Sequence, residues 1–202
     1  MKDPLVVSIH YRRHADRDPV LYEDIRKPAA FLPDDIDTHI LVYADQVDGW
    51  FLQWGRYLLS PDKHNAGFVV LQIAIAQIEG IEQYWEGSDS KGDEPGFFKR
   101  GAKRILDLKD SSLTESILSA LYSNCRCGLF HTGMTKVRID IDRNYPKLLD
   151  LLDETVRINQ NLLMEAVSSF FTNYVAELSD KRNVERRVCF EKTWKNMREI
   201  RP

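Results

Sequence analysis

Arg126 and His131 are the two residues of this chain whose types and spacing could carry out chemistry. They open and close the segment Arg126-Cys127-Gly128-Leu129-Phe130-His131. An arginine holds a phosphate with a planar, permanently charged fork, and a histidine exchanges a proton near neutral pH. The pair is therefore a candidate for acting on a phosphodiester, and its surroundings must decide between this role and a structural one.

A helix is expected through this segment, because apolar residues recur every four positions from Leu113 to Leu129. Residues five apart on an α-helix are rotated by about 140°, so Arg126 and His131 would not share a face. Either the helix ends or tightens near Gly128, or two copies of the protein bring their helices together across a twofold axis. In the last turn of the helix, His131 would be favoured in its protonated form, which suits a proton donor.

Two interpretations of Arg126 stay open. Tyr122 precedes it by four residues and Phe130 follows it by four, so its stem would run along an aromatic flank. A guanidinium that is partly desolvated there binds an anion more strongly. Alternatively, Arg126 pairs with an acidic residue of the preceding long helix, such as Glu79 or Glu82, and His131 only complements the helix C-terminus. Spacing alone favours the second interpretation.

Two basic stretches could supply a local surface for nucleic acid. The formal net charge of −3 excludes a basic coat over the whole protein, so such binding needs a local patch. The candidate RNA-contacting residues are Lys99, Arg100, Lys103, Arg104, Arg186 and Arg187. The alternative is that these residues form the solvated outer faces of their helices.

Composition predicts a soluble protein of the cytoplasm. The chain is 43% hydrophobic and 29% charged, which is ordinary for a globular domain. Three cysteines, Cys125, Cys127 and Cys189, form no paired disulfide framework and fit a reducing compartment. Cys125 and Cys127 lack the second pair of ligands that a zinc site needs, so neither a metal nor a cofactor is expected. The apolar runs predict neither a signal peptide nor a bilayer span.

Hydrophobic periodicity predicts an all-α fold, an up-and-down bundle of about five or six helices. We expect an N-terminal arm over residues 1–33, the helical bundle over 34–180, and a basic C-terminal helix over 181–202 packed on the bundle. A short β-ribbon after the motif helix would pair residues 135–141 with 154–158, with a helical turn at 148–152 between them.

The stretch from Leu121 to Gly133, LYSNCRCGLFHTG, resembles the HEPN superfamily. These all-α domains are defined by an arginine, four to six intervening residues and a histidine at the end of a bundle helix. The order of helices is similar as well, with an apolar helix at 66–85 before the motif and another at 162–178 after it. The resemblance covers residues 36–180.

The resemblance implies a metal-independent endoribonuclease, a hydrolase of toxin–antitoxin or defence systems, whose composite site is built by two copies of the motif. In that chemistry the RNA 2′-hydroxyl attacks its neighbouring phosphate, His131 transfers the proton and Arg126 stabilises the phosphorane. The implied partners are RNA, a second copy of the chain, and an antitoxin or a nucleotidyltransferase.

One position departs from the family pattern. Active members often carry Asn, Asp or His directly after the arginine, whereas this chain has Cys127. We therefore expect Tyr122, Asn124 and Cys127 to be supporting residues, with Asn124 as the candidate replacement for the orienting group. The family also includes inactive members, so a non-catalytic module that binds a nucleotide or a protein is the alternative function.

Overall fold

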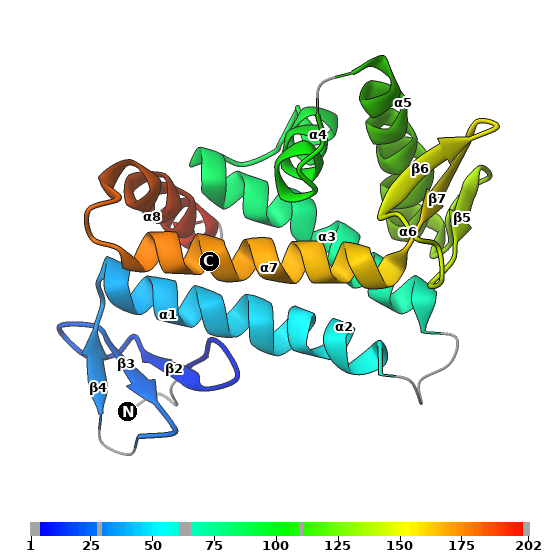
Figure 1. The fold of residues 1–202 in the computed structure, drawn as a ribbon. Coiled ribbons are helices and arrows are strands. Elements are labelled where there is room, and N and C mark those ends of the chain that lie inside the picture. Colours follow the sequence, from blue (N-terminus) through cyan, green and yellow to red (C-terminus); the bar gives the residue numbers. More distant parts are fainter. Residues whose placement is uncertain (1–4, 28–29, 61–65, 110, 200–202) are drawn as a thin grey trace.

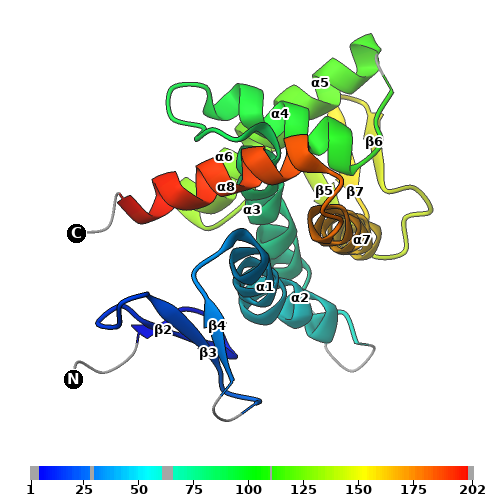
Figure 2. The same ribbon diagram turned by 90° about the vertical axis from the view of Figure 1, so that its left-hand side faces the viewer.

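A computed structural model describes residues 5–27, 30–60, 66–109 and 111–199. Six helices and two small β-sheets make up this part of the chain, and the sheets lie at opposite ends of the molecule (Figures 1 and 2). The predicted all-α fold is therefore wrong, because the protein is mixed α/β.

The first long helix is continuous but changes its winding. It consists of α1 (Ile36–Val47), the π-helical segment η1 (Asp48–Leu52) and α2 (Gln53–Leu58). Asp35 caps its start, because its carboxylate accepts a hydrogen bond from the Thr38 N–H at 2.9 Å.

The central helix is α3 (Gly67–Glu86), which packs against α4 (Glu94–Ile105), α7 (Gln160–Ser179) and α8 (Val184–Glu199). Its buried positions, between Val70 and Glu82, cover somewhat more than half of the helix circumference, whereas Phe68 and Val69 in its first turn are exposed. Gly87 ends α3 in the left-handed region, with φ of 73°. Figure 1 shows α7 running alongside α1 and α2, so α3 is enclosed between these helices and α4.

The motif helix also contains a π-helical segment. It runs through α5 (Ser112–Ala120), η2 (Leu121–Arg126) and α6 (Cys127–Thr132). Ser111 caps its start by accepting a hydrogen bond from the Thr114 N–H, and Gly133 ends it with φ of 72°.

The N-terminal segment, predicted as an arm over residues 1–33, folds into an antiparallel sheet of four strands. Its strands, in the order β1-β2-β3-β4, are β1 (Leu5–Val6), β2 (Tyr11–His14), β3 (Leu21–Asp24) and β4 (Phe31–Pro33). The strands are too short for a clear alternation of apolar and polar residues. One of the inward positions is moreover an acid, Asp24, which is buried in an ion pair with Arg26.

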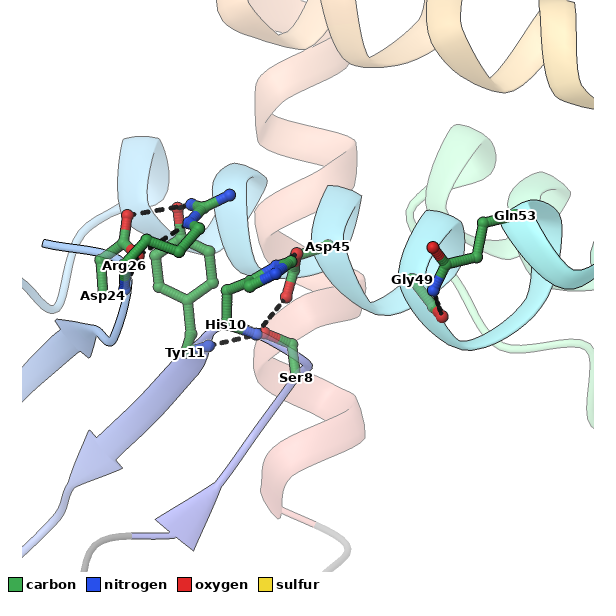
Figure 3. Close-up of polar contacts among 8 residues, drawn as sticks. All are labelled: Ser8, His10, Tyr11, Asp24, Arg26, Asp45, Gly49 and Gln53. Atoms are coloured by element: carbon green, nitrogen blue, oxygen red, sulfur yellow. Dashed lines mark hydrogen bonds and ion pairs between the residues drawn. The ribbon is translucent and has the colours of Figure 1, made fainter.

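Polar contacts fasten this sheet to α1 (Figure 3). The carboxylate of Asp45 accepts hydrogen bonds from the His10 backbone N–H at 2.8 Å and lies 2.6 Å from the His10 Nδ1 atom. Hydrogen bonds from Ser8 and His10 outweigh the effect of burial and lower the pKa of Asp45. The turn between β1 and β2 is thus tied to α1 by the Asp45 carboxylate, while Tyr11 and Tyr22 of the same sheet are buried in the hydrophobic core.

The second sheet follows the motif helix and has the order β5-β7-β6. Its strands are β5 (Ile139–Ile141), β6 (Leu149–Leu152) and β7 (Thr155–Ile158). The two predicted strands are present in shortened form and pair in parallel, but the predicted helical turn at 148–152 is strand β6. Asp153 and Glu154 make the tight turn between β6 and β7 with φ of 47° and 63°, a conformation usually signalled by Gly or Asn.

Candidate functional site

The motif helix carries Arg126 and His131 to different faces. The π-helical segment ends at Arg126, and α6 continues as a regular helix to Thr132. The rotation of about 140° between residues five apart therefore applies to this pair. The predicted tightening of the helix near Gly128 is wrong, so a single chain does not bring the two side chains together.

Arg126 makes an ion pair with α3. Its Nε and Nη2 atoms donate to one oxygen of Glu79, Oε2, at 3.2 and 2.9 Å. The other oxygen of Glu79 accepts a hydrogen bond from the Ser90 hydroxyl at 2.7 Å. Glu79 is one of the two acids that the structural interpretation of Arg126 named, whereas nothing in the sequence pattern pointed to Ser90.

Aromatic rings hold the guanidinium of Arg126 from its own helix. The guanidinium carbon lies 4.9 Å from the centre of the Phe130 ring and 5.7 Å from that of Tyr122. Its side chain is 20% exposed, and among the described residues no acceptor engages its Nη1 atom. The group is thus fixed in direction while keeping one donor nitrogen available.

His131 lies exposed in the last turn of α6. Within the described ranges it makes neither a hydrogen bond nor an ion pair. Large apolar side chains next to it are also exposed: Phe130 at 48%, Met134 at 54% and Val137 at 79%. The His131 imidazole therefore lies at an accessible and unusually apolar corner of the molecule.

The predicted supporting residues lie along the π-helical segment. Asn124 offers its backbone carbonyl to the Lys136 N–H at 2.8 Å, which folds the following loop back onto the helix. Gly128 permits this close approach, since a Cβ atom there would come within 2.6 Å of the Met134 carbonyl oxygen. Burial raises the pKa of Tyr122, and the adjacent Cys127 thiol raises it further. Cys127 thus lies against Tyr122, and the backbone carbonyl of Asn124 holds the following loop.

The basic residues of α4 contact acidic and hydroxyl groups of the same chain. Lys99 donates to the Ser119 hydroxyl at 2.9 Å, and Arg100 lies 3.2 Å from Asp93. Arg104 makes a two-pronged ion pair with Glu82 at 3.0 and 3.2 Å. Lys103 has a partner as well. This stretch is thus committed to internal contacts that join α4 to α3 and α5.

The two candidate arginines of α8 are equally engaged. Arg187 donates to the Leu178 carbonyl and to Asp37, both at 2.6 Å, and is buried. Arg186 donates to the Trp85 carbonyl at 2.6 Å and lies 3.6 Å over the Trp85 ring. These contacts favour the structural interpretation of the basic residues over a dedicated surface for RNA.

Further properties bear on the class of site. Among the described residues no group of three or more His, Cys, Asp or Glu side chains is arranged to hold a metal ion. Across the same ranges, every helix is too short or too polar to cross a bilayer. Comparison of the chain with protein-family models, with curated proteins and with solved structures gave no match.

Proposed function

We propose that this protein is a metal-independent endoribonuclease that cuts RNA at a composite site formed by two copies of the chain. Arg126 and His131 carry the chemistry. The attacking group is the RNA 2′-hydroxyl, which forms a bond to the adjacent phosphorus while the 5′-oxygen leaves. His131 transfers the proton of the attacking 2′-hydroxyl to the leaving 5′-oxygen, and Arg126 stabilises the negative charge on the phosphorane.

One observation carries the proposal: His131 is exposed and has no partner among the described residues, while Arg126 is held by Glu79 and leaves its Nη1 atom without an acceptor in the same ranges. Because the two side chains leave opposite sides of one helix, the histidine that serves a given arginine must come from a second copy. The exposed apolar residues around His131 support this, since Phe130, Met134 and Val137 would be covered on association. An antitoxin or a nucleotidyltransferase is the further partner that the resemblance to the HEPN superfamily implies.

Glu79 has two opposite effects on this site. It orients the guanidinium, and a preorganised donor stabilises a transition state without reorganising during the reaction. It also cancels one positive charge, which weakens the attraction for a phosphate. The proposal therefore requires that the phosphate binds mainly through Nη1, beside the ion pair.

The test is cleavage of a single-stranded RNA in excess chelator by the full chain, by Arg126→Lys and by His131→Ala. We expect wild-type products with a cyclic phosphate end and a loss of at least about 100-fold in both variants. Arg182→Ala is the control, because this exposed arginine pairs with Asp180 in the turn between α7 and α8, outside the motif helix. An all-DNA strand of the same sequence should stay intact, since it lacks the 2′-hydroxyl.

A second candidate function is a non-catalytic module that binds a nucleotide or a protein, and the Arg126–Glu79 ion pair favours it. A neutralised arginine is better suited to positioning than to stabilising a phosphorane. Intact RNA under all conditions, with the wild-type chain folded and dimeric, would select this function. A wild-type chain that is monomeric at micromolar concentration would exclude the composite site.

A further inference from the structure

The N-terminal sheet has an outer face that no role has yet been given. Tyr11 and Tyr22 belong to the hydrophobic core, so the residues that alternate with them along the strands lie on the opposite face. The register places Arg12, Glu23 and Phe31 of that face side by side on β2, β3 and β4. Figure 1 shows this sheet at the opposite end of the molecule from α6, so its outer face is separate from the proposed nuclease site.

Phe31 is the centre of an exposed stack on this outer face. Phe31 is 39% exposed, and the guanidinium carbon of Arg17 lies 4.2 Å from the centre of its ring. The His14 ring meets Phe31 edge-on, with 5.4 Å between the ring centres. Arg17 is exposed and makes neither a hydrogen bond nor an ion pair within the described ranges. A planar cation is thus stacked on a ring at the surface, with its donors unused.

Arg12 adds a second unpaired cation to the same face. Its cross-strand neighbour Glu23 is engaged by His14 instead, with 3.0 Å between Glu23 Oε2 and His14 Nε2. Arg12 is exposed and, like Arg17, has no acidic partner among the described residues. The candidate RNA-contacting residues of α4 and α8 all have internal partners, whereas these two arginines keep their charges for a partner outside the chain.

Two acids limit how a polyanion can cross this face. Asp16 and Asp18 lie on either side of Arg17 in the turn between β2 and β3, and both are exposed. They repel a phosphate at the turn, so Arg17 is better suited to stacking on a neutral base. Arg12 and Phe31 are two strand spacings apart, about 10 Å, so one or two nucleotides can reach from the stack to Arg12.

We propose that the outer face of the N-terminal sheet binds single-stranded RNA. An unpaired base stacks on the Arg17 guanidinium, which the Phe31 ring supports, and a phosphate meets Arg12. A duplex binds less well, because its bases are stacked on one another and do not reach the arginine. The choice of RNA rests on the proposed nuclease function, whereas the contacts themselves use only a base and a phosphate.

Fluorescence anisotropy of the full chain with a labelled single strand of DNA tests these contacts without cleavage, since DNA lacks the 2′-hydroxyl. Phe31→Leu and Arg17→Lys should each weaken binding at least about fivefold, because each loses one plane of the stack while the charge is kept. The matched controls are Phe51→Leu, at a phenylalanine of η1 that is 40% exposed, and Arg182→Lys, at an exposed arginine between α7 and α8. Both controls should bind as the wild type does. RNA of the same sequence should behave like the DNA strand when it is bound to the His131→Ala chain.

The dependence of binding on salt separates the phosphate contact from the stacking contact. On a single strand, the logarithm of the binding constant falls with the logarithm of the salt concentration by about 0.7 for each neutralised phosphate. Arg12→Gln should therefore reduce this slope by about 0.7, whereas Phe31→Leu should leave it unchanged. Melting temperatures identify a variant that binds weakly because it is unfolded. If Phe31→Leu is such a variant, Arg17→Lys carries the test, because its side chain is exposed.

Three results would overturn the proposal. They are an unchanged anisotropy up to about 100 µM protein, the weak limit of non-specific binding to nucleic acid; wild-type affinity in both Phe31→Leu and Arg17→Lys; and equal affinity for the single strand and for its duplex. None of them bears on the proposed cleavage, which depends on Arg126 and His131. Conversely, intact RNA together with the expected binding pattern would contradict the nuclease and support this surface as a site for single strands.

Discussion

Two arginine–glutamate pairs lie one turn apart on α3, and they differ in how completely the arginine is neutralised. Arg104 of α4 meets two carboxylates, with a two-pronged contact to Glu82 and a further contact of 3.0 Å to Glu86. Arg126 of η2 meets a single carboxylate oxygen, because Ser90 occupies the other oxygen of Glu79. Both guanidinium groups also lie over aromatic rings.

The difference separates a structural ion pair from a candidate site. A phosphate approaching Arg104 would face the two carboxylates that pair with it. A phosphate approaching Arg126 would face the Glu79 carboxylate, which is shared with a hydroxyl, and the Glu94 carboxylate, which is near enough to interact electrostatically with Arg126. Aromatic packing fixes both arginines in direction, but only Arg126 combines this with an incompletely matched charge. Neighbouring pairs of the same residue types can thus have different capacities for an external anion.

Replacing Arg104 by methionine should have the largest effect on stability. Glu82 is 1% exposed, and the substitution leaves its buried carboxylate without its two-pronged partner. We expect a loss of about 3 kcal/mol in the free energy of unfolding, measured by urea denaturation. The estimate is at the low end because Arg100 remains 3.9 Å from Glu82. A loss below that of the exposed control Arg138→Met would show that this pair does not hold α4 on α3.

Replacing Arg126 by methionine should cost less, about 2 kcal/mol in the same measurement. Glu79 keeps the hydrogen bond from the Ser90 hydroxyl, so one of its two oxygens remains partnered. The double variant Arg126→Met with Ser90→Ala should lose more than the sum of the single losses, because no described partner of Glu79 remains. Strict additivity would mean that Ser90 does not compensate for the arginine.

The sequence predicted part of this arrangement. The five-residue spacing correctly placed Arg126 and His131 on different helix faces, and the four-residue spacing placed Tyr122 and Phe130 beside the guanidinium. Glu79 was one of two acids considered, but spacing along one helix cannot select between neighbouring turns of another. That selection depends on how α3 and the motif helix cross, which is a tertiary property.

The fold was predicted less well where local signals conflict with packing. The helices follow apolar residues at 3.6-residue periodicity, and each has enough length for the pattern to be read. The strands are two to four residues long, and Asp24 occupies an inward position because Arg26 neutralises it. Strand β6 depends on a turn at Asp153 and Glu154. Both have positive φ angles, but the turn lacks the glycine that would have predicted this conformation from the sequence.

The pH dependence of stability should reveal that the carboxylate paired with Arg104, that of Glu82, is buried. Burial raises the pKa of Glu82 above its ordinary value of 4.5, and Arg104 offsets this only in part. As the pH rises above 4.5, the unfolded chain therefore loses the Glu82 proton at a lower pH than the folded chain does. The free energy of unfolding falls as the pH rises between the pKa of Glu82 in the unfolded chain and its raised pKa in the folded chain. Glu82→Gln removes the effect, so its stability relative to the wild type should increase as the pH rises from 4.5.

The comparison should be made by urea denaturation at several pH values, with Glu154→Gln as the control for an exposed glutamate. If the difference between Glu82→Gln and the wild type were independent of pH, or changed in the opposite direction, Arg104 rather than burial would dominate this carboxylate.

The smallest effect on stability is expected at Arg186, which lies over the Trp85 ring as Arg104 does. Trp85 lies between the two guanidinium groups of Arg104 and Arg186, at 4.6 and 3.6 Å from their carbon atoms. Arg186→Lys keeps the positive charge but loses the planar stacking and the fixed donor to the Trp85 carbonyl. We expect a loss of about 0.5–1 kcal/mol in the free energy of unfolding. Because the carboxylates of Glu82 and Glu86 hold Arg104 more strongly than the Trp85 ring does, the Arg104→Met loss should be nearly the same in the Arg186→Lys background. A smaller loss there would mean that the ring, and not the carboxylates, sets the strength of the Arg104 pair.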